Sequence, residues 1–283
     1  MSDNRKNVEE ILEYYNKGIE ADRLQCGIGK IEFERTKDII SRYLSKEKLV
    51  IYDIGGGAGT YSRWLAKLGH EVHLFDLSPK LVEIAKEKSK NENENNIYKI
   101  EVADARRINR PDESADIVLL MGPLYHLTER KERLLALKEA KRVLKEEGIV
   151  IIAAITRFGS TLYGLSVYGQ KNNLIEEDEF MEMIERELTD GQHIRPEKYP
   201  GFIARAYFHL PDELANEIKE VGLEHEKNIA VEGPIWIVPA FEEKWSLEDS
   251  RKRMLKIARM VEEEKSIMGM SPHFIAIARK KQN

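Results

Sequence analysis

The chain has 283 residues, of which 42% are hydrophobic and 34% charged, so it can build a sizeable core and is not a wholly disordered protein. Its 45 basic and 50 acidic residues give a formal net charge of −5, which disfavours nucleic acid or an anionic membrane as its partner. A single cysteine, Cys26, excludes an internal disulfide framework and any all-cysteine metal or iron–sulfur site, and nothing else predicts a metal.

The targeting signals are the next feature. The first seven residues are polar, and no apolar stretch of the secretory type follows them. The longest strongly apolar run, 148–155, is far too short to span a bilayer. We therefore expect a cytoplasmic protein without a membrane partner. The sequence contains no signal for an oligomeric state.

The N-terminal segment and the middle of the chain differ in the pattern of their apolar residues. Apolar residues three and four positions apart predict a helix over 8–19 and a second one over 31–44, so 1–45 forms an N-terminal helical segment. Short apolar runs then alternate with helical patterns. The predicted strands cover 49–54, 71–77, 97–102, 117–121 and 148–155. Strands separated by single helices favour a parallel sheet covered on both faces.

Two helix starts carry capping residues, and the alternation of strands and helices ends after Thr156. Ser78 is expected to cap a helix that begins at Pro79, and Thr128 to cap another. The segment 157–210 is rich in aromatic and polar residues without a strand period, which predicts a mostly helical insertion. The last part predicts a helix from Pro211, a helix over 241–265 and two more strands, at 223–231 and 274–278.

A glycine-rich turn follows the first predicted strand, in the sequence IYDIGGGAGTYS at 51–62. Glycines let the backbone approach a ligand closely, and the start of the next helix offers free N–H groups. Thr60 and Ser62 occupy the positions where a dinucleotide fingerprint needs its last glycine, and no lysine follows as in a P-loop. Asp53 would repel a pyrophosphate and favours a ligand with a cationic amino-acid end.

Four segments in order now resemble one family. The glycine turn at 53–59 is similar to motif I of the class I S-adenosylmethionine (SAM) dependent methyltransferases. The segments at 73–78, 102–105 and 114–127 resemble the motifs at the second, third and fourth strands of that family, and 137–152 resembles the helix and strand that follow. The likeness covers about 46–156 well and is strongest toward its small-molecule branch, methyltransferase type 11/25.

The resemblance implies a fold, a cofactor and a set of binding residues. The fold is a Rossmann-like seven-stranded, mostly parallel sheet with helices on both faces, here forming a methyltransferase domain at 46–283. The cofactor is SAM, with S-adenosylhomocysteine as product. In this family the acid at Asp76 accepts both ribose hydroxyls and that at Asp104 meets the adenine amino group. The cofactor-binding residues expected from it are Asp53, Gly55, Gly56, Gly57, Gly59, Tyr61, Asp76, Leu77, Ser78, Asp104, Ala105, Met121, Gly122 and Tyr15.

The methyl acceptor should meet the cofactor after the fourth strand, at 122–127. His126 is the best candidate for a general base because its ordinary pKa lies near neutrality, and Tyr125 and Arg157 complete the catalytic candidates. Alternatively, Tyr125 and His126 only cap and pack the turn. The motif Asn/Asp-Pro-Pro-Tyr/Phe of amino-methyltransferases is absent, which speaks against an exocyclic base amine as acceptor.

The N-terminal segment and the insertion at 157–210 are the expected lid over the ligands. Its candidate residues are Tyr14, Tyr15, Arg23, Glu34, Arg35, Arg157, Tyr163 and Tyr168. An anionic acceptor would need a cation, which Arg157 or Arg205 could supply. We expect in-line methyl transfer to an oxygen or nitrogen of a small molecule. The alternatives are an RNA or protein methyltransferase, a non-catalytic protein that binds SAM or S-adenosylhomocysteine and, more distantly, a nicotinamide oxidoreductase.

Overall fold

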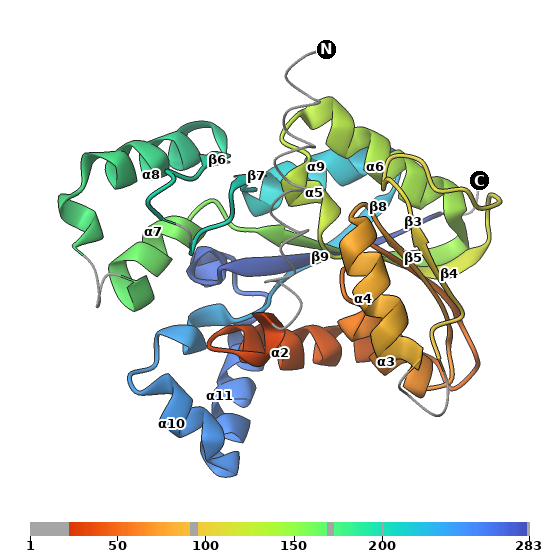
Figure 1. The fold of residues 1–283 in the computed structure, drawn as a ribbon, viewed down its shortest axis with the longest axis horizontal. Helices are drawn as coiled ribbons and strands as arrows, with labels where there is room; N and C mark the ends of the chain where they lie inside the picture. The colour runs from red at the N-terminus through yellow and green to blue at the C-terminus, as the bar shows by residue number, and fades with distance from the viewer. Residues whose placement is uncertain (1–22, 91–95, 169–172, 200, 282–283) are drawn as a thin grey trace.

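A seven-stranded sheet is the centre of the computed structural model, which describes residues 23–90, 96–168, 173–199 and 201–281 (Figure 1). Its strand order is β3-β2-β1-β4-β5-β9-β8. Strands β1 to β5 run parallel, and β9 runs antiparallel to both β5 and β8. The strands are β1 (Val50–Ile54), β2 (Glu71–Asp76), β3 (Lys99–Val102), β4 (Ala115–Leu120), β5 (Leu144–Ile155), β8 (Glu224–Ala230) and β9 (His273–Arg279). The predicted Rossmann-like architecture is confirmed.

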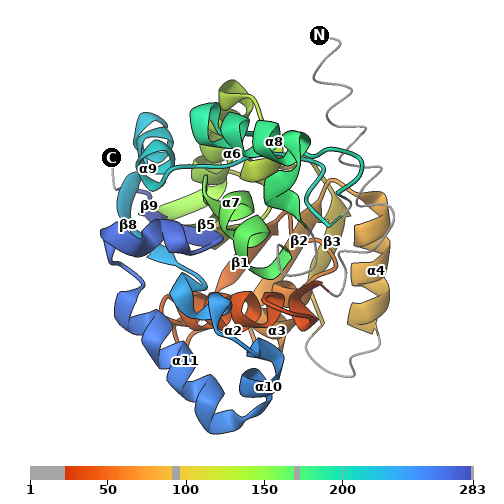
Figure 2. The ribbon, with the colours of Figure 1, turned by 90° about the vertical axis from the view of Figure 1, so that its left-hand side faces the viewer.

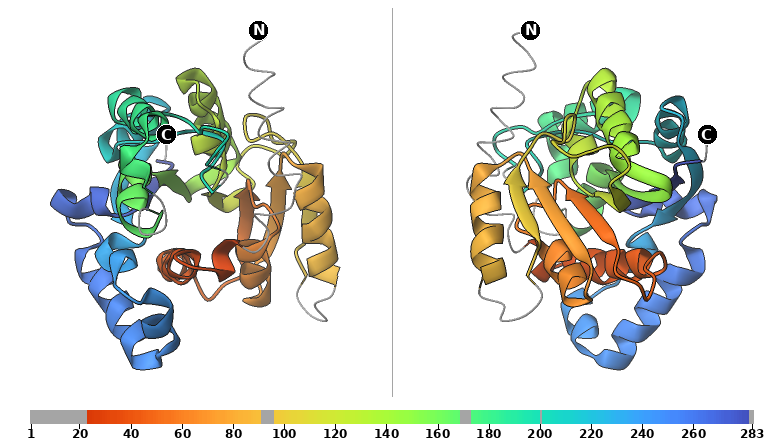
Figure 3. Two further views of the ribbon diagram at one scale, coloured as in Figure 1. Left: turned by 60° about the vertical axis from the view of Figure 1, so that its left-hand side comes forward. Right: turned by 90° about the vertical axis from the view of Figure 1, so that its right-hand side faces the viewer.

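Helices cover both faces of the sheet because successive strand residues point to opposite sides. In β1, Ile51 packs in one apolar cluster with α2 (Gly29–Ser41), α3 (Thr60–Lys67) and α4 (Pro79–Lys90). The next residue, Tyr52, packs in another cluster with α6 (Arg130–Val143) and α9 (Pro211–Glu220). Figure 3 shows α4 beside the β3 edge of the sheet.

The helix caps give one confirmed and one wrong prediction. The Ser78 hydroxyl accepts a hydrogen bond from the Leu81 amide at 3.2 Å, so Ser78 does cap α4. Thr128 does not cap α6, because that helix begins at Arg130 with Glu129 as its N-cap. The carbonyl of Thr128 instead accepts from the Arg133 guanidinium at 2.8 Å. The first predicted helix and Tyr15 lie outside the described residues.

The insertion at 157–210 contains α7 (Gly159–Tyr163), the π-helical turn η2 (Gly164–Tyr168), the 3-10 turn η3 (Leu174–Glu176) and α8 (Asp178–Asp190). It also contains a small antiparallel sheet of β6 (Gln192–Ile194) and β7 (Arg205–Tyr207), which the sequence did not predict. Phe180, Tyr199 and Phe202 form a small apolar core of this segment. Its aromatic residues therefore serve largely to pack it.

The C-terminal helices α10 (Phe241–Ser246) and α11 (Glu248–Val261) lie beside α2, as Figures 1 and 2 both show. Ile31 of α2 packs there with Trp236, Trp245 and Met254. The helical pattern predicted over 241–265 is broken at Leu247, which is the N-cap of α11. Within the described residues, no helix has the length and apolar character needed to cross a membrane.

Candidate active site

The turn after β1 is shaped by its glycines. Gly55 and Gly57 have φ values of +79° and +55°, which disfavour a side chain. The amides of Gly55 and Gly56 donate to the Phe75 carbonyl at 2.7 and 3.1 Å, which holds the turn on β2. A Cβ at Gly55 would lie 2.5 Å from Cδ of Pro123. The turn is therefore fixed by both its backbone conformation and its close neighbours.

Asp76 ends β2 beside this turn. Its two carboxylate oxygens accept the amides of Gly57 and Ser78, each at 2.8 Å. Burial raises the pKa of Asp76, although these two amides oppose the rise. Since β1 and β2 are parallel with Ile54 opposite Phe75, the glycine turn and Asp76 emerge at the same edge of the sheet.

Asp104 follows β3 at that edge, in contact with Arg106. The Arg106 Nε lies 2.9 and 3.1 Å from the two oxygens of Asp104. Burial raises the pKa of Asp104, but the bonds from Arg106 outweigh it and bring the pKa below its ordinary value. Arg106 also contacts Glu132 at 2.5 Å. This arginine is part of the site, and the sequence analysis did not anticipate it.

Asp53 is a buried acid under the glycine turn, with only 1% of its surface exposed. Its Oδ2 accepts the Ser62 hydroxyl at 2.6 Å. Its Oδ1 has no hydrogen-bond partner among the residues that the structure describes. Burial raises the pKa of Asp53 to about 6, with Ser62 opposing the rise and Asp76 adding to it. A buried carboxyl oxygen without a donor among the described residues thus lies next to the cavity, which Asp53 lines.

A cavity of about 810 Å³ opens on these groups. It gathers fourteen of the seventeen candidate residues that the sequence put forward. They are Asp53, Gly55, Gly56, Gly57, Tyr61, Asp76, Leu77, Ser78, Asp104, Ala105, Met121, Gly122, Tyr125 and His126. Gly59 does not line it; a Cβ at this position would lie 3.2 Å from Ile97 and from Leu74, in the core behind the turn. Tyr15 lies outside the described residues.

Arg157, predicted to be catalytic, does not line the cavity. Its Nη2 lies 2.8 and 2.7 Å from the two oxygens of Glu213 in α9, and its Nε donates to the Phe208 carbonyl. This buried arginine therefore ties the end of β5 to α9, which corrects the prediction. Arg205 is also absent from the described lining of the cavity.

Of the residues predicted to form the lid, some line the cavity and others do not. Arg35 is buried and bound to Glu262 and Asp38, and Glu34 lies 3.7 Å from Lys37, so neither reaches the cavity. Two other candidates, Arg23 and Tyr163, do line the cavity.

Tyr125 and His126 belong to α5 (Pro123–His126), the short helix after β4. Their rings contact edge to face with centroids 4.7 Å apart. Burial lowers the pKa of His126 to about 4, against a hydrogen bond with the backbone of Arg205 that raises it. The imidazole is therefore neutral at pH 7 and is a weak base.

A second group of ionisable side chains lines the cavity, and of its members the sequence analysis named only Arg23. Arg23, Glu32 and His273 contribute to its wall, and Glu232 lies behind His273. The Arg23 guanidinium binds both oxygens of Glu32, at 2.5 and 2.8 Å. These residues come from separate segments, so no spacing along the sequence could have revealed the cluster.

Comparisons with known proteins agree with this geometry. Residues 52–152 match the methyltransferase domain family. A ubiquinone/menaquinone biosynthesis C-methyltransferase of Neisseria meningitidis is 29% identical over 152 residues, 53% of this chain and 59% of the relative. A ubiquinone biosynthesis O-methyltransferase of Cereibacter sphaeroides is 28% identical over 193 residues, 68% of this chain and 66% of the relative. The match thus spans about three fifths of the Neisseria protein's length.

Solved structures share the fold. A SAM-dependent methyltransferase of Methanosarcina mazei aligns with a TM-score of 0.58 at 19% identity, over 87% of this chain and 98% of its own. The magnesium protoporphyrin IX methyltransferase of Synechocystis, solved with bound S-adenosylhomocysteine, aligns with a TM-score of 0.59 at 15% identity, over 97% and 100%. The domain match shows that this chain contains a methyltransferase domain over 52–152, and its sheet order is that of the fold it shares with these solved structures.

Proposed function

We propose that this protein transfers the methyl group of SAM to a small-molecule acceptor bound in the cavity, and releases S-adenosylhomocysteine. The observation that carries the proposal is the convergence of Asp53, the glycine turn, Asp76 and Asp104 on one cavity at the carboxyl ends of β1, β2 and β3. Ligands of open α/β sheets bind at this edge. The proposed cofactor is SAM, which the class I methyltransferases use.

The chemistry of these groups suits SAM. The buried Oδ1 of Asp53, which has no partner within the described ranges, needs a donor, and the cationic amino-acid end of SAM offers one. Asp76 is held by two amides and keeps acceptor capacity on each oxygen for ribose hydroxyls. Gly55 and Gly57 line the cavity with backbone that carries no side chain.

The rest of the cavity suits a largely apolar small molecule. The wall formed by the insertion and by the residue before β9 includes Tyr163, Phe202, Phe208 and Pro272. A volume of about 810 Å³ lies within the range of small-molecule sites. One relative is named as a C-methyltransferase and the other as an O-methyltransferase of ubiquinone biosynthesis; the second supports an oxygen nucleophile, while a nitrogen nucleophile stays open. The net charge of −5 disfavours RNA.

The protein's contribution to the reaction is mainly alignment and exclusion of water. SAM supplies an activated methyl group on a sulfonium. In-line transfer needs the nucleophile, the methyl carbon and the sulfur on one line, so fixed walls contribute a large part of the rate. The neutral ring of His126 and the hydroxyl of Tyr125, both in α5 at the cavity wall, are placed to contact the acceptor.

Two measurements test this function. Calorimetry with SAM, S-adenosylhomocysteine and NADH should show micromolar binding of the first two and none of the third. SAM with a labelled methyl group is then incubated with a panel of phenols, catechols, carboxylic acids and amines, and transfer to at least one class is expected. Failure to bind either adenosyl ligand would refute the proposal, and binding without any transfer would favour the non-catalytic alternative.

A further inference from the structure

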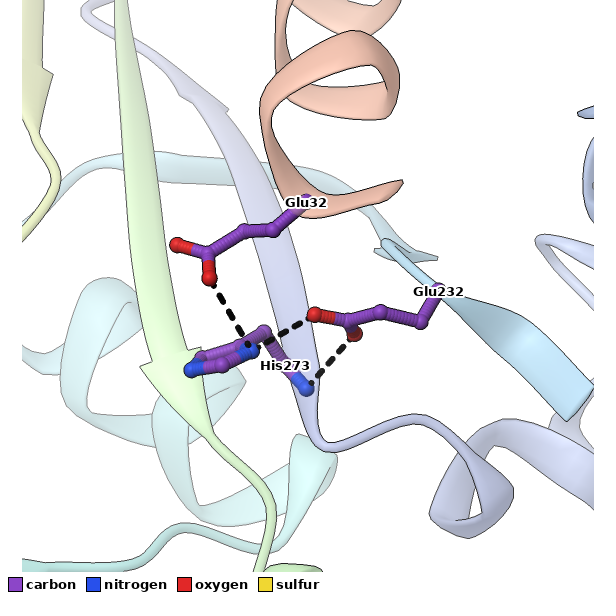
Figure 4. A group of neighbouring side chains, drawn as sticks. All are labelled: Glu32, Glu232 and His273. Atoms are coloured by element: carbon purple, nitrogen blue, oxygen red, sulfur yellow. Dashed lines mark hydrogen bonds and ion pairs between the residues drawn. The ribbon is translucent and has the colours of Figure 1, made fainter. Parts of the chain in front are cut away.

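Three ionisable side chains from distant parts of the chain meet at the cavity (Figure 4). Glu32 lies in the first turn of α2, Glu232 follows β8, and His273 begins β9. Each offers one oxygen or nitrogen atom, and these three atoms lie within 4.8 Å of one another. Glu32 and His273 line the cavity, and Glu232 is fully buried behind them.

One nitrogen of His273 is committed to Glu232. Its Nδ1 lies 2.7 Å from Oε1 of Glu232 and 3.8 Å from Oε2 of Glu32. The other oxygen of Glu232 accepts the backbone amide of His273 at 3.0 Å and the Ser271 hydroxyl at 2.9 Å. Since carboxylates only accept, Nδ1 must carry the proton in this contact. The ring is thereby fixed in orientation and tautomer.

The second nitrogen of His273 is then left for the cavity. Figure 4 shows it on the side of the ring away from Glu232. No hydrogen bond to Nε2 is found within the described part of the chain, and the His273 side chain is 19% exposed. With the proton on Nδ1, Nε2 has a lone pair. A bound acceptor can therefore meet a proton-accepting atom at this wall.

The charges around His273 favour its protonated form. Burial lowers its pKa, but Glu32 and Glu232 outweigh it, so the pKa lies above the ordinary 6.5, with Arg23 opposing the rise. Although burial raises the pKa of Glu32, Arg23 and His273 bring it to about 2. When His273 is protonated, its imidazolium and the Arg23 guanidinium together balance the charges of the two carboxylates.

The same balance argues against a metal ion in the cluster. Both oxygens of Glu32 are taken by Arg23, and both oxygens of Glu232 by donors of His273 and Ser271. A divalent cation would have to displace these donors and lie next to a guanidinium. The cluster is complete as a proton-binding site without one.

We propose that His273 is the general base of the methyl transfer and that Glu232 is its positioning residue, a role that rests on the proposed function. The acceptor is a hydroxyl or amine. As its oxygen or nitrogen bonds to the methyl carbon, the carbon–sulfur bond breaks with its electron pair going to sulfur. The acceptor's proton passes to Nε2 of His273, and the resulting imidazolium is stabilised by Glu232 and Glu32.

The first test is nitrogen-15 NMR of the histidine side chains in the whole protein, with His273→Asn to assign the signal. We expect His273 to titrate above pH 6.5 and, above that pKa, to carry its proton on Nδ1. Glu232→Gln should lower the pKa, and Glu32→Gln serves as the second variant if the first does not fold. A proton on Nε2, no titration between pH 5 and 9, or displacement of the signal by added Mg²⁺ or Zn²⁺ would overturn the proposal.

The second test separates the base from the overall function. With an acceptor of the phenol and amine panel, His273→Asn should lower kcat about 100-fold or more and remove the acidic fall of the pH profile, while SAM affinity by calorimetry stays within twofold. His225→Gln on β8, which lies outside the described cavity lining, should leave both unchanged. If the unmodified protein does not bind SAM, the proposed function itself is refuted. If the unmodified protein and His273→Asn have equal kcat, only the role of His273 is overturned.

Discussion

The Oδ2 atom of Asp76 accepts the amide of Gly57 at 2.8 Å. The acid that ends the second strand therefore holds the glycine turn that ends the first, so these two parts of the site form one wall. Asp76 also accepts the amide of Ser78, the residue that caps α4. A change at Asp76 should consequently affect both the ligand contact and the shape of the turn.

We expect Asp76→Ala to weaken SAM binding at least tenfold, which corresponds to about 1.4 kcal/mol. The change removes the acceptor of the ribose hydroxyls and leaves the amides of Gly57 and Ser78 without their partner. Calorimetry with SAM and S-adenosylhomocysteine measures the change in affinity. Asp249→Ala, an exposed acid in the first turn of α11, is the control and should change nothing. Unchanged affinity in Asp76→Ala would defeat the ribose assignment.

Gly55→Ala should reduce both stability and SAM affinity. The residue has a φ of +79°, and its new Cβ would lie 2.5 Å from the Pro123 ring, so the turn or α5 must shift. Gly69→Ala is a matched control, because Gly69 has a φ of +92° but a Cβ there would meet no atom of the described residues within 4 Å. It should cost about 1 kcal/mol of unfolding free energy and leave SAM binding intact. Equal effects of the two changes would show that crowding at Pro123 is unimportant.

The parts of the site that follow one strand were predictable, because local patterns encode them. The glycine turn, Asp76 and Asp104 each follow an apolar run that gives the strand, and parallel strands bring their ends to one edge. The capping pair Ser78 and Pro79 is equally local.

The parts that depend on distant partners were not predictable. Arg157 was placed in the site by residue type, but its partner Glu213 lies 56 positions further along and removes it from the cavity. His273 had no motif, and its partner Glu232 lies 41 positions before it. The strands β6 and β7 have three residues each, too few to show a period of two.

SAM affinity should depend on pH through Asp53. Burial raises its pKa to about 6, above the 3.8 of an ordinary aspartate, so the folded protein binds this proton more tightly than the unfolded chain. The stabilisation from that proton is full below about pH 4 and is lost as the pH rises through 6. A cationic ligand binds better to the ionised form of Asp53. SAM affinity should therefore fall by up to tenfold per pH unit as the pH drops below 6.

Calorimetry between pH 5 and 7.5 in two buffers of different ionisation enthalpy measures this linkage. We expect binding to release a proton near pH 6 in the unmodified protein. Asp53→Asn, which keeps an acceptor for the Ser62 hydroxyl, should flatten the pH dependence. A slope that survives in this variant would assign the titration to another group.

His126→Ala should reduce turnover more than SAM binding, if the ring contacts the acceptor. Because its pKa is about 4, the imidazole is neutral over the working range, and its loss should lower kcat/KM without moving the pKa of the pH profile. Turnover of the panel acceptor gives kcat/KM, and calorimetry gives the affinity for SAM. Equal losses in both would indicate that His126 only packs α5 against β7.

Arg35→Ala tests a residue that the sequence placed in the lid and the structure places in the core. Arg35 is 1% exposed, binds Glu262 and donates from Nε to the Val231 carbonyl at 3.1 Å. Removing one partner of a buried ion pair leaves the other charge poorly compensated, which costs about 3–5 kcal/mol. Arg42 still binds Glu262, at 2.6 Å, so we expect the lower end of that range.

Urea unfolding measures this loss, and calorimetry should find SAM affinity unchanged in the folded fraction, because Arg35 does not line the cavity. Arg259→Ala provides the comparison. Arg259 binds Asp38 on the same helix, but its side chain is 59% exposed, so its removal should cost less than about 1 kcal/mol. If Arg35→Ala instead kept its stability and lost SAM binding, the lid assignment would be the correct one. Arg35 and Arg259 both form ion pairs between α2 and the α11 region, one buried and one exposed, so the contrast separates burial from charge as the source of stability.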